Sequence, residues 1–315
     1  MGYPGWNERK ALLPELVGAV AELVRAIIDE VRPRLVAAAV SGERGERVNE
    51  RHSDNFLSQF DIMLHHRYRE LLTQILPGFV YVSEEADPQV VGNDPDPEIC
   101  VLVDPLDTSE LAVRALNAYT QVLLYSRRLR RPVAAVVGDV FHYVQLYVAG
   151  RTDDGSDQAF IVTSESDILR MRRPEHVRLS DALVTNFLMK PEERFVPLAR
   201  QERLISALAR VAAGAKPRGR IGLDFGSVGL CHVAAGFTDA MVEFAKGFAI
   251  WDLMPGQYVL KAAGGHIVDL DGHDLAFDHS FDTLERISES MKRRQRFIAA
   301  RSPDLAAELA AHLTL

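Results

Sequence analysis

The chain has 315 residues, and its 36 Lys and Arg against 44 Asp and Glu give a formal net charge of −8. This length suits one large domain or two moderate ones, and this charge excludes a broad basic face for nucleic acid. The sequence has no run of about 18 apolar residues and no basic-then-apolar leader, and its two cysteines, Cys100 and Cys231, lack CxxC spacing. We therefore expect a soluble, cytoplasmic protein with reduced thiols, no membrane contact and no nucleic acid partner.

Helical patterns dominate the first part of the chain. Apolar residues at helical spacing predict one long amphipathic helix over residues 8–40, bent near Pro33, and a second helix that opens at residue 55 and runs to Pro77-Gly78. A polar, glycine-containing loop over residues 41–53 joins them. Asp61 falls in the first turn of the second helix, where an acid complements the helix dipole.

The next two predicted strands both end in acids. The short apolar strand 79–82 leads into Ser83-Glu84-Glu85, and the apolar run 99–103 leads into Asp104-Pro105-Leu106-Asp107-Thr108-Ser109-Glu110. We expect the second strand to stop at the acid and the proline, because proline cannot continue a ladder. The segment between the two motifs, 86–98, is rich in Asp and Pro and predicts a surface connection.

The second of these motifs has the residue types of a metal-assisted phosphate site. An isolated Asp-Pro-x-Asp is more often an N-cap in an exposed turn, but two strand ends with paired acids are far less often accidental. The helix predicted after Ser109 begins with free N–H groups and a positive dipole end, which attract anions. Carboxylates beside an anion site are compatible when divalent cations lie between them, and oxygen ligands favour Mg²⁺.

The remaining elements are shorter. Residues 121–125, 133–137 and 144–148 predict an antiparallel meander, and we expect an N-terminal α+β half over residues 1–185 and a C-terminal α/β half over residues 186–315. Trp251-Asp252 opens a helix, and such a pair alone indicates an N-cap. The other elements predicted in the second half are strands over 182–187, 238–244 and 267–270 and helices over about 197–213, 226–236 and 303–313.

Taken together, Ser83-Glu84-Glu85, the motif from Asp104 to Glu110, and Trp251-Asp252 resemble the motifs of the inositol monophosphatase family. This family belongs to a superfamily of Mg²⁺-dependent, lithium-sensitive sugar and nucleotide phosphatases. The resemblance extends from Asn55 to about Ala300. It implies an α+β fold, a layered αβαβα sandwich of the inositol monophosphatase and fructose-1,6-bisphosphatase type, and a homodimer.

The resemblance also implies a set of metal ligands for two or three Mg²⁺ ions per site. Four acids and one backbone carbonyl supply their oxygen atoms: Glu84, Asp104, the Leu106 carbonyl, Asp107 and Asp252. Asp104 would bridge two ions, and Asp252 would bind the second. Clustered carboxylates repel one another, which is an independent reason to expect cations among them.

Further residues acquire roles toward water and substrate through the same resemblance. Glu84 and the pair Asp61 and Ser109 would orient the attacking water. Thr108 and Ser109 would meet the phosphate of a small phosphorylated substrate. Glu243 matches the acceptor of a substrate hydroxyl, although its spacing to the Trp-Asp motif differs from the family pattern.

The sequence departs from that pattern at the phosphate cradle. Thr108 replaces a glycine, so a β-branched side chain stands where a backbone amide should meet phosphate, and we expect its hydroxyl to be recruited for a particular substrate. Met254-Pro255-Gly256 replaces Ala-Ala-Gly, and Asn55 replaces the family's first acid.

Because the metal ligands are kept, the sequence predicts a Mg²⁺-dependent phosphomonoesterase for a small polyol, sugar or nucleoside phosphate. The alternative, favoured by Thr108 and Met254, is a diverged family member that binds a phosphorylated ligand or partner without efficient turnover.

Overall fold

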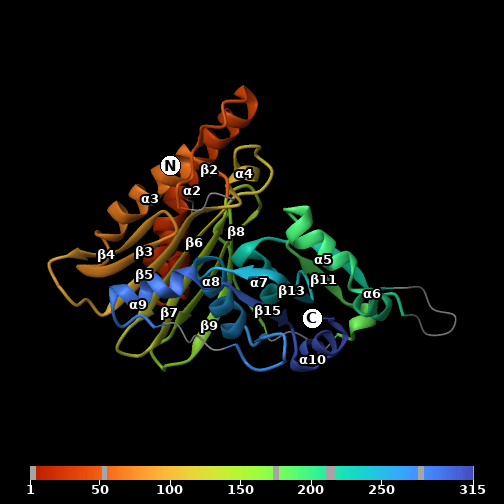
Figure 1. Cartoon of the computed structure of the whole chain (residues 1–315). Helices are drawn as coiled ribbons and strands as arrows, with labels where there is room; N and C mark the ends of the chain where they lie inside the picture. Colours follow the sequence, from red (N-terminus) through yellow and green to blue (C-terminus); the bar gives the residue numbers. More distant parts are fainter. Residues whose placement is uncertain (1–4, 52–54, 173–176, 211–217, 276–279, 315) are drawn as a thin grey trace. The chain divides into compact units, whose positions relative to one another are not determined.

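The computed structural model describes residues 5–51, 55–172, 177–210, 218–275 and 280–314 (Figure 1). The chain forms two compact units, Met1–Arg170 with His279–Lys292, and Met171–Asp278 with Arg293–Leu315. Both contain helices and a β-sheet, so the predicted α+β class is confirmed. The expected boundary after residue 185 falls inside the second unit, and as a division into independently folding halves it stays a prediction.

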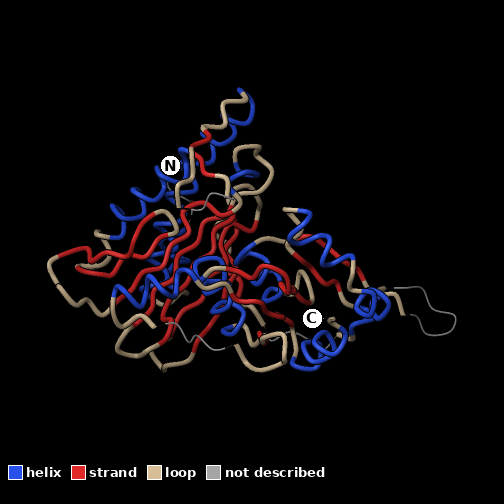
Figure 2. Tube along the Cα trace, viewed as in Figure 1, coloured by secondary structure: helices blue, strands red, loops and turns tan. Residues whose placement is uncertain are grey.

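The first unit is built on an eight-stranded sheet with the order β10-β9-β8-β7-β6-β5-β3-β4. Neighbouring strands are antiparallel except β3 and β5, which are parallel. The predicted meander is present as β6, β7 and β8, and Figure 2 shows these strands in red. The eight strands are β3 (Gly78–Ser83), β4 (Ala86–Gly92), β5 (Ile99–Asp107), β6 (Tyr119–Ser126), β7 (Arg131–Asp139), β8 (Val144–Arg151), β9 (Asp157–Thr163) and β10 (Ile168–Arg170).

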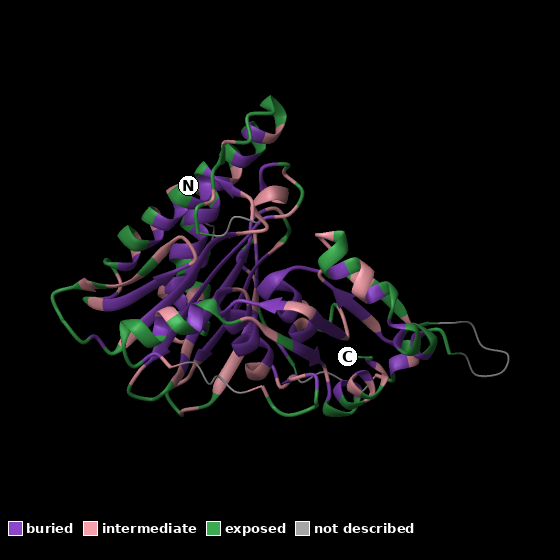
Figure 3. Cartoon of the chain, viewed as in Figure 1, coloured by how far each residue is buried: buried purple, intermediate pink, exposed green. Residues whose placement is uncertain are grey.

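Two helices, α2 (Glu15–Ser41) and α3 (Gln59–Leu72), cover one face of this sheet (Figure 1). Their apolar sides, including Ile28 and Leu64, form one buried core with Val122 and Val136 of the sheet. Full burial of such a side chain stabilises the fold by about 1.5–3 kcal/mol. Figure 3 shows these strands buried and the outer sides of both helices exposed. The short elements of this unit are α1 (Trp6–Arg9), η1 (Lys10–Leu12), β1 (Glu46–Arg47), β2 (Leu57–Ser58), α4 (Ser109–Ala112) and α9 (Leu284–Lys292).

The structure corrects the sequence predictions for the first helix of this unit and for the segment 86–98. The helix predicted over residues 8–40 is interrupted before Glu15, because Pro14 takes the extended N-cap position of α2, while Pro33 is accommodated inside that helix. The connection predicted over residues 86–98 contains the strand β4. This strand lies at the edge of the sheet, where a proline such as Pro88 is tolerated because one side needs no ladder bonds.

The second unit has a five-stranded sheet with the order β12-β11-β13-β15-β14. Strand β11 is parallel to β12 and β13, whereas β15 is antiparallel to β13 and β14. Side chains of α6 and α10 share a buried core with β11, β13 and β15. The strands are β11 (Leu183–Asn186), β12 (Arg220–Leu223), β13 (Ala240–Phe248), β14 (His266–Val268) and β15 (Gln295–Ala300), and the helices are η2 (Leu179–Asp181), η3 (Pro191–Phe195), α5 (Val196–Ala199), α6 (Glu202–Leu208), α7 (Gly226–Ala235), α8 (Ile250–Ala262) and α10 (Pro303–His312).

The helix predicted over residues 197–213 is replaced by two short helices, α5 and α6, and residues 211–213 lie outside the described part of the chain. Helices α7 and α8 pack closely, and a side chain at Gly256 would come within 2.4 Å of the Ser227 carbonyl oxygen. Within the described ranges, no helix is both long and apolar enough to cross a membrane.

Candidate active site

Asp104 lies in an irregular stretch near the end of β5. The register between β5 and β6 shifts between Asp104 and Asp107, around Pro105, which has no N–H for a ladder bond. We expected the strand to stop at this proline, and that prediction was wrong, since the irregularity lets β5 continue to Asp107. Asp104 is 1% exposed, and its Oδ1 accepts a hydrogen bond from the Leu106 N–H at 3.1 Å.

Gln121 on β6 links the two acids of β5. Its Nε2 lies 3.1 Å from Asp104 Oδ2 and 3.4 Å from Asp107 Oδ2. An amide that donates to both carboxylates stabilises their ionised, acceptor form. Gln121 is fully buried, and its Oε1 has no hydrogen-bond partner among the described residues. Sequence reasoning missed Gln121, because its partners follow from strand register.

Asp61 and Ser109 meet although they are far apart in the sequence. Ser58 caps α3, and its N–H in turn donates to Asp61 Oδ2 at 2.7 Å, which forms a capping box. This box fixes the carboxylate, and Asp61 Oδ1 accepts a hydrogen bond from Ser109 Oγ. Ser109 Oγ also lies 2.7 Å from the Leu106 carbonyl oxygen. The roles of Asp61 and Ser109 toward water stay predictions.

Two acids near β3 and α3, Asp61 and Glu85, resist ionisation. Burial raises the pKa of Asp61, although hydrogen bonds from Ser109 and Ser58 act in the opposite direction. Burial and then the charge of Asp61 raise the pKa of Glu85 to about 7. A divalent cation would relieve both effects, so the electrostatics of these residues fit a metal.

Glu84, the predicted metal ligand of this motif, is half-buried at the end of β3, and its N–H donates to the Val103 carbonyl at 3.3 Å. Its role as a ligand stays a prediction. The next residue, Glu85, was not singled out from the sequence, because nothing local distinguishes the two acids of the motif.

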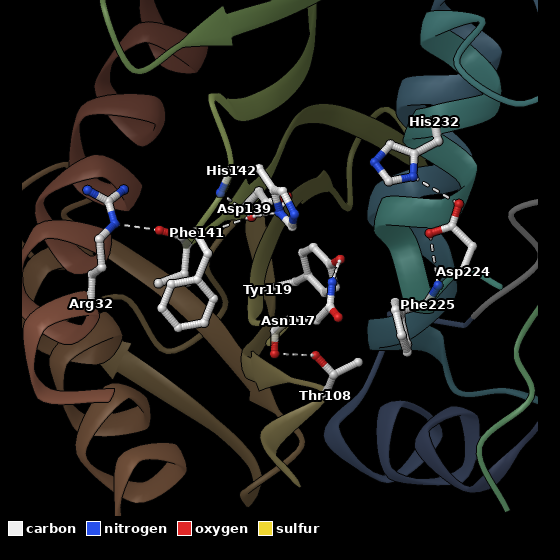
Figure 4. A network of polar contacts seen from close by, with 11 residues as sticks. Arg32, Thr108, Asn117, Tyr119, Asp139, Phe141, His142, Asp224, Phe225 and His232 are labelled. Carbon is white, nitrogen blue, oxygen red and sulfur yellow. Dashed lines mark hydrogen bonds and ion pairs between the residues drawn. The ribbon is translucent and has the colours of Figure 1, made fainter. Parts of the chain in front are cut away.

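Thr108 occupies a left-handed backbone conformation, with φ 61° and ψ 38°, just before α4. Glycine adopts this conformation without strain, whereas a β-branched residue does not, which gives a backbone reason for the glycine of the family pattern. The Thr108 hydroxyl lies 2.6 Å from the Asp107 carbonyl and 3.3 Å from the Asn117 carbonyl, as Figure 4 shows for Asn117. The Thr108 hydroxyl therefore donates its proton to backbone carbonyls of this loop. Toward a substrate it could act only as a hydrogen-bond acceptor, through its lone pairs.

Asp252 belongs to the second unit, in the first turn of α8. Its Oδ2 accepts a hydrogen bond from the Ala249 N–H at 3.3 Å, so Asp252 serves the helix start from its third position, whereas the N-cap expected at the Trp-Asp pair falls on Ala249. The Asp252 carbonyl also accepts a bond from Ser227 Oγ at 2.7 Å, which ties α8 to α7. Its role as a metal ligand stays a prediction. The side chain of Met254 in α8 is fully buried and fills space in the core.

Glu243, also in the second unit, is 2% exposed on β13. Its carboxylate forms an ion pair with Arg194 and accepts the N–H groups of Ala245 at 3.1 Å and Gly247 at 3.0 Å. Burial lowers the pKa of Arg194 to about 10, and its guanidinium lies 4.4 Å from the ring centroid of Phe187. The role of Glu243 as acceptor of a substrate hydroxyl stays a prediction. Its carboxylate oxygens already accept hydrogen bonds from three donors within the protein.

Acids at the strand ends of an α+β fold are compatible with a metal-dependent phosphatase class. The chain matches the inositol monophosphatase family over residues 12–314, and it belongs to that family. Membership supports a metal-dependent phosphatase at the level of the family.

Two curated relatives illustrate the range of this family. Nus factor SuhB of Pasteurella multocida (strain Pm70) is 24% identical over 220 residues, which are 70% of this chain and 74% of the relative. The fructose-1,6-bisphosphatase/inositol-1-monophosphatase of Archaeoglobus fulgidus is 25% identical over 195 residues, which are 61% of this chain and 64% of the relative.

Solved structures agree on the fold. The extragenic suppressor protein suhB of Bartonella henselae has a TM-score of 0.64 at 18% identity, covering 94% of this chain and 98% of that one. Staphylococcal IMPase-I complexed with products has a TM-score of 0.65 at 16% identity, covering 93% and 92%. At these identities the likeness shows the fold alone.

Proposed function

We propose that this protein is a Mg²⁺-dependent phosphomonoesterase that hydrolyses a small polyol, sugar or nucleoside phosphate. One observation carries the proposal: Asp104 and Asp107, two acids at the end of one strand, share the amide of Gln121. Two further acids, Asp61 and Glu85, have pKa values raised by burial. Such a concentration of acids, of which Asp61 and Asp104 are buried, is stable in its ionised form when cations neutralise it.

The donor set contains only oxygen, as Mg²⁺ prefers. The proposed ligands are Glu84, Asp104, the Leu106 carbonyl and Asp107, and the family resemblance adds Asp252. Bound Mg²⁺ supplies a water of lowered pKa and neutralises phosphate charge. Gln121 holds the Asp104 and Asp107 carboxylates in their ionised form, because both accept from the same amide group.

Ser109 and Asp61 support the proposed orientation of the water. A hydroxyl has one proton, and Ser109 has two acceptors within reach, Asp61 Oδ1 and the Leu106 carbonyl. When Ser109 donates to Asp61, its lone pairs accept a hydrogen bond from a water held beside it. The capping box fixes Asp61, so this acceptor is in place before substrate binds.

Asp104→Asn tests the proposal directly. The wild type should bind Mg²⁺ by calorimetry and release inorganic phosphate from at least one member of a panel of small phosphomonoesters, and the variant should lose both properties. Asp154→Asn, in the exposed β8–β9 connection, is the matched control and should keep both. Unchanged Mg²⁺ affinity in Asp104→Asn would contradict the metal assignment.

A second candidate function is binding of a phosphorylated ligand or partner without efficient turnover. The strained backbone of Thr108 favours it, and so does the name Nus factor carried by relatives from Pasteurella multocida and Xylella fastidiosa. Mg²⁺ binding without phosphate release from any ester in the panel would support this alternative. We also propose a homodimer, as the family resemblance implies, and a cytoplasmic location, as the sequence composition suggests. Sedimentation velocity tests the oligomeric state.

A further inference from the structure

We infer that His142 contacts the substrate through a hydrogen bond between its Nε2 and a hydroxyl group of the leaving alcohol. His142 would thus favour hydroxylated phosphomonoesters over esters whose alcohol has no hydroxyl. This inference rests on the proposed phosphatase function.

The register of the sheet brings His142 to the edge that carries the predicted metal ligands. Asp107 on β5 pairs with Tyr119 on β6, and Tyr119 pairs with Asp139 on β7. Neighbouring strands lie about 4.8 Å apart, so the backbone of Asp139 is roughly 10 Å from that of Asp107. His142 follows Asp139 by three residues in the turn between β7 and β8. A ligand held at Asp107 and extending across two strands would therefore reach this turn.

A buried carboxylate fixes the imidazole of His142. Asp139 is 2% exposed, and its Oδ1 accepts the N–H groups of Phe141 and His142, each at 3.1 Å. The Nδ1 atom of His142 lies 3.0 and 2.9 Å from the two carboxylate oxygens. Since a carboxylate only accepts, we assign the hydrogen to Nδ1. Nε2 is then the ring atom available to a ligand, on a side chain that is 56% exposed.

The turn itself does not require this histidine. The two backbone N–H bonds to Asp139 form the turn whatever side chain follows at position 142. Holding the exposed ring of His142 in one orientation costs side-chain entropy. The buried acid Asp139 nevertheless orients this ring, as carboxylates orient catalytic and metal-binding histidines.

Polar groups continue along the same edge toward Thr108. The Asn117 side-chain amide donates to the Tyr119 hydroxyl at 2.9 Å, and the Asn117 carbonyl accepts from the Thr108 hydroxyl. Figure 4 shows Thr108, Asn117 and Tyr119 in sequence, with Asp139 and His142 beyond them. The edge between Thr108 and His142 is thus polar, as a hydroxylated ligand requires.

The chemistry of Nε2 selects a hydroxyl as its partner. In the neutral ring Nε2 has a lone pair, which repels phosphate oxygens and accepts a bond from a hydroxyl; in the charged ring it donates. A hydroxyl can donate or accept, so it fits both forms. A phosphate oxygen fits only the charged ring.

The test compares two kinds of ester at saturating Mg²⁺. The polyol phosphates are inositol 1-phosphate, glucitol 6-phosphate and glycerol 2-phosphate, and the reference is p-nitrophenyl phosphate, whose alcohol has no further hydroxyl. His142→Ala and His142→Phe should lower kcat/KM on the best polyol phosphate by about 3- to 10-fold, as the loss of one neutral hydrogen bond predicts. Both variants should leave the reference reaction and the Mg²⁺ affinity unchanged.

Tyr143→Phe, on the same turn and 54% exposed, is the matched control and should behave as the wild type on all esters. Equal losses on both kinds of ester, or no loss on either, would overturn the inference and leave the phosphatase proposal intact. A wild type that hydrolyses only the reference ester would also overturn it. A wild type that hydrolyses no ester would overturn the proposed function, and the inference with it.

Discussion

Acid should destabilise this protein through His65, which is buried between α3 and the end of β3. The residue is 5% exposed, its Nδ1 lies 3.0 Å from Ser83 Oγ, and its carbonyl accepts a hydrogen bond from the Tyr81 hydroxyl at 3.0 Å. Burial, with smaller contributions from the charges of His66 and Arg69, lowers the pKa of His65 from 6.5 to about 4.

The pKa difference determines both the direction and the size of the effect. Between pH 6.5 and 4 the unfolded chain binds a proton at His65 that the folded chain does not bind. The contribution to stability is therefore fully present above about pH 6.5 and is lost as the pH falls toward 4. A pKa lower by about 2.5 corresponds to roughly 3 kcal/mol. This is a large share of the 5–15 kcal/mol that is typical of a folded domain.

Urea unfolding at pH 8, 6, 5 and 4.5 measures this loss. Carboxylates add a pH dependence of their own, so the informative quantity is the difference between the wild type and His65→Gln, whose amide can still bond Ser83. The wild type should lose about 2 kcal/mol more than this variant by pH 4.5. His66→Gln provides a comparison, because it keeps the buried imidazole of His65 and removes only the smaller contribution of the His66 charge, so it should reduce the slope less than His65→Gln does. Equal slopes in the wild type and His65→Gln would refute the reasoning.

Three further outcomes are expected. Ser109→Ala should lower kcat with little change in KM, because the proposed role of its bond to Asp61 is to orient the attacking water, and a rise in KM alone would place Ser109 in substrate binding. Thr108→Gly should change the free energy of unfolding by less than about 1 kcal/mol. The variant loses the hydrogen bonds of the hydroxyl, which costs about 1 kcal/mol, but it is relieved of roughly 1–2 kcal/mol of strain in the left-handed backbone. A changed kcat/KM on one ester alone would then indicate that Thr108 contacts the substrate. Arg194→Leu should lower the free energy of unfolding, measured with urea, by about 3–5 kcal/mol, because Glu243 is then buried without its ion-pair partner. The double variant that combines Arg194→Leu with Glu243→Leu should recover part of that loss. A double variant as unstable as the single one would contradict this account.

Local sequence patterns predicted correctly the strands that are buried along their whole length. The strands β6, β7 and β8 read as apolar runs between turns because the sheet interior buries them throughout. The strand β4 was missed because an edge strand meets water on one side and tolerates Asp87 and Pro88. The continuation of β5 past Pro105 was missed because it depends on a register shift against β6, which the sequence of β5 does not contain.

The sequence by itself determined which acids follow which strands, and with the family motifs it singled out Asp61 and Ser109, which the fold brings together. Only the tertiary structure decided the partners of Asp104 and Glu243. Gln121 reaches Asp104 across 17 positions, and Arg194 reaches Glu243 across 49. No spacing rule connects such residues, because strand register and burial choose the partner of a buried charge, and both arise from packing of the whole unit.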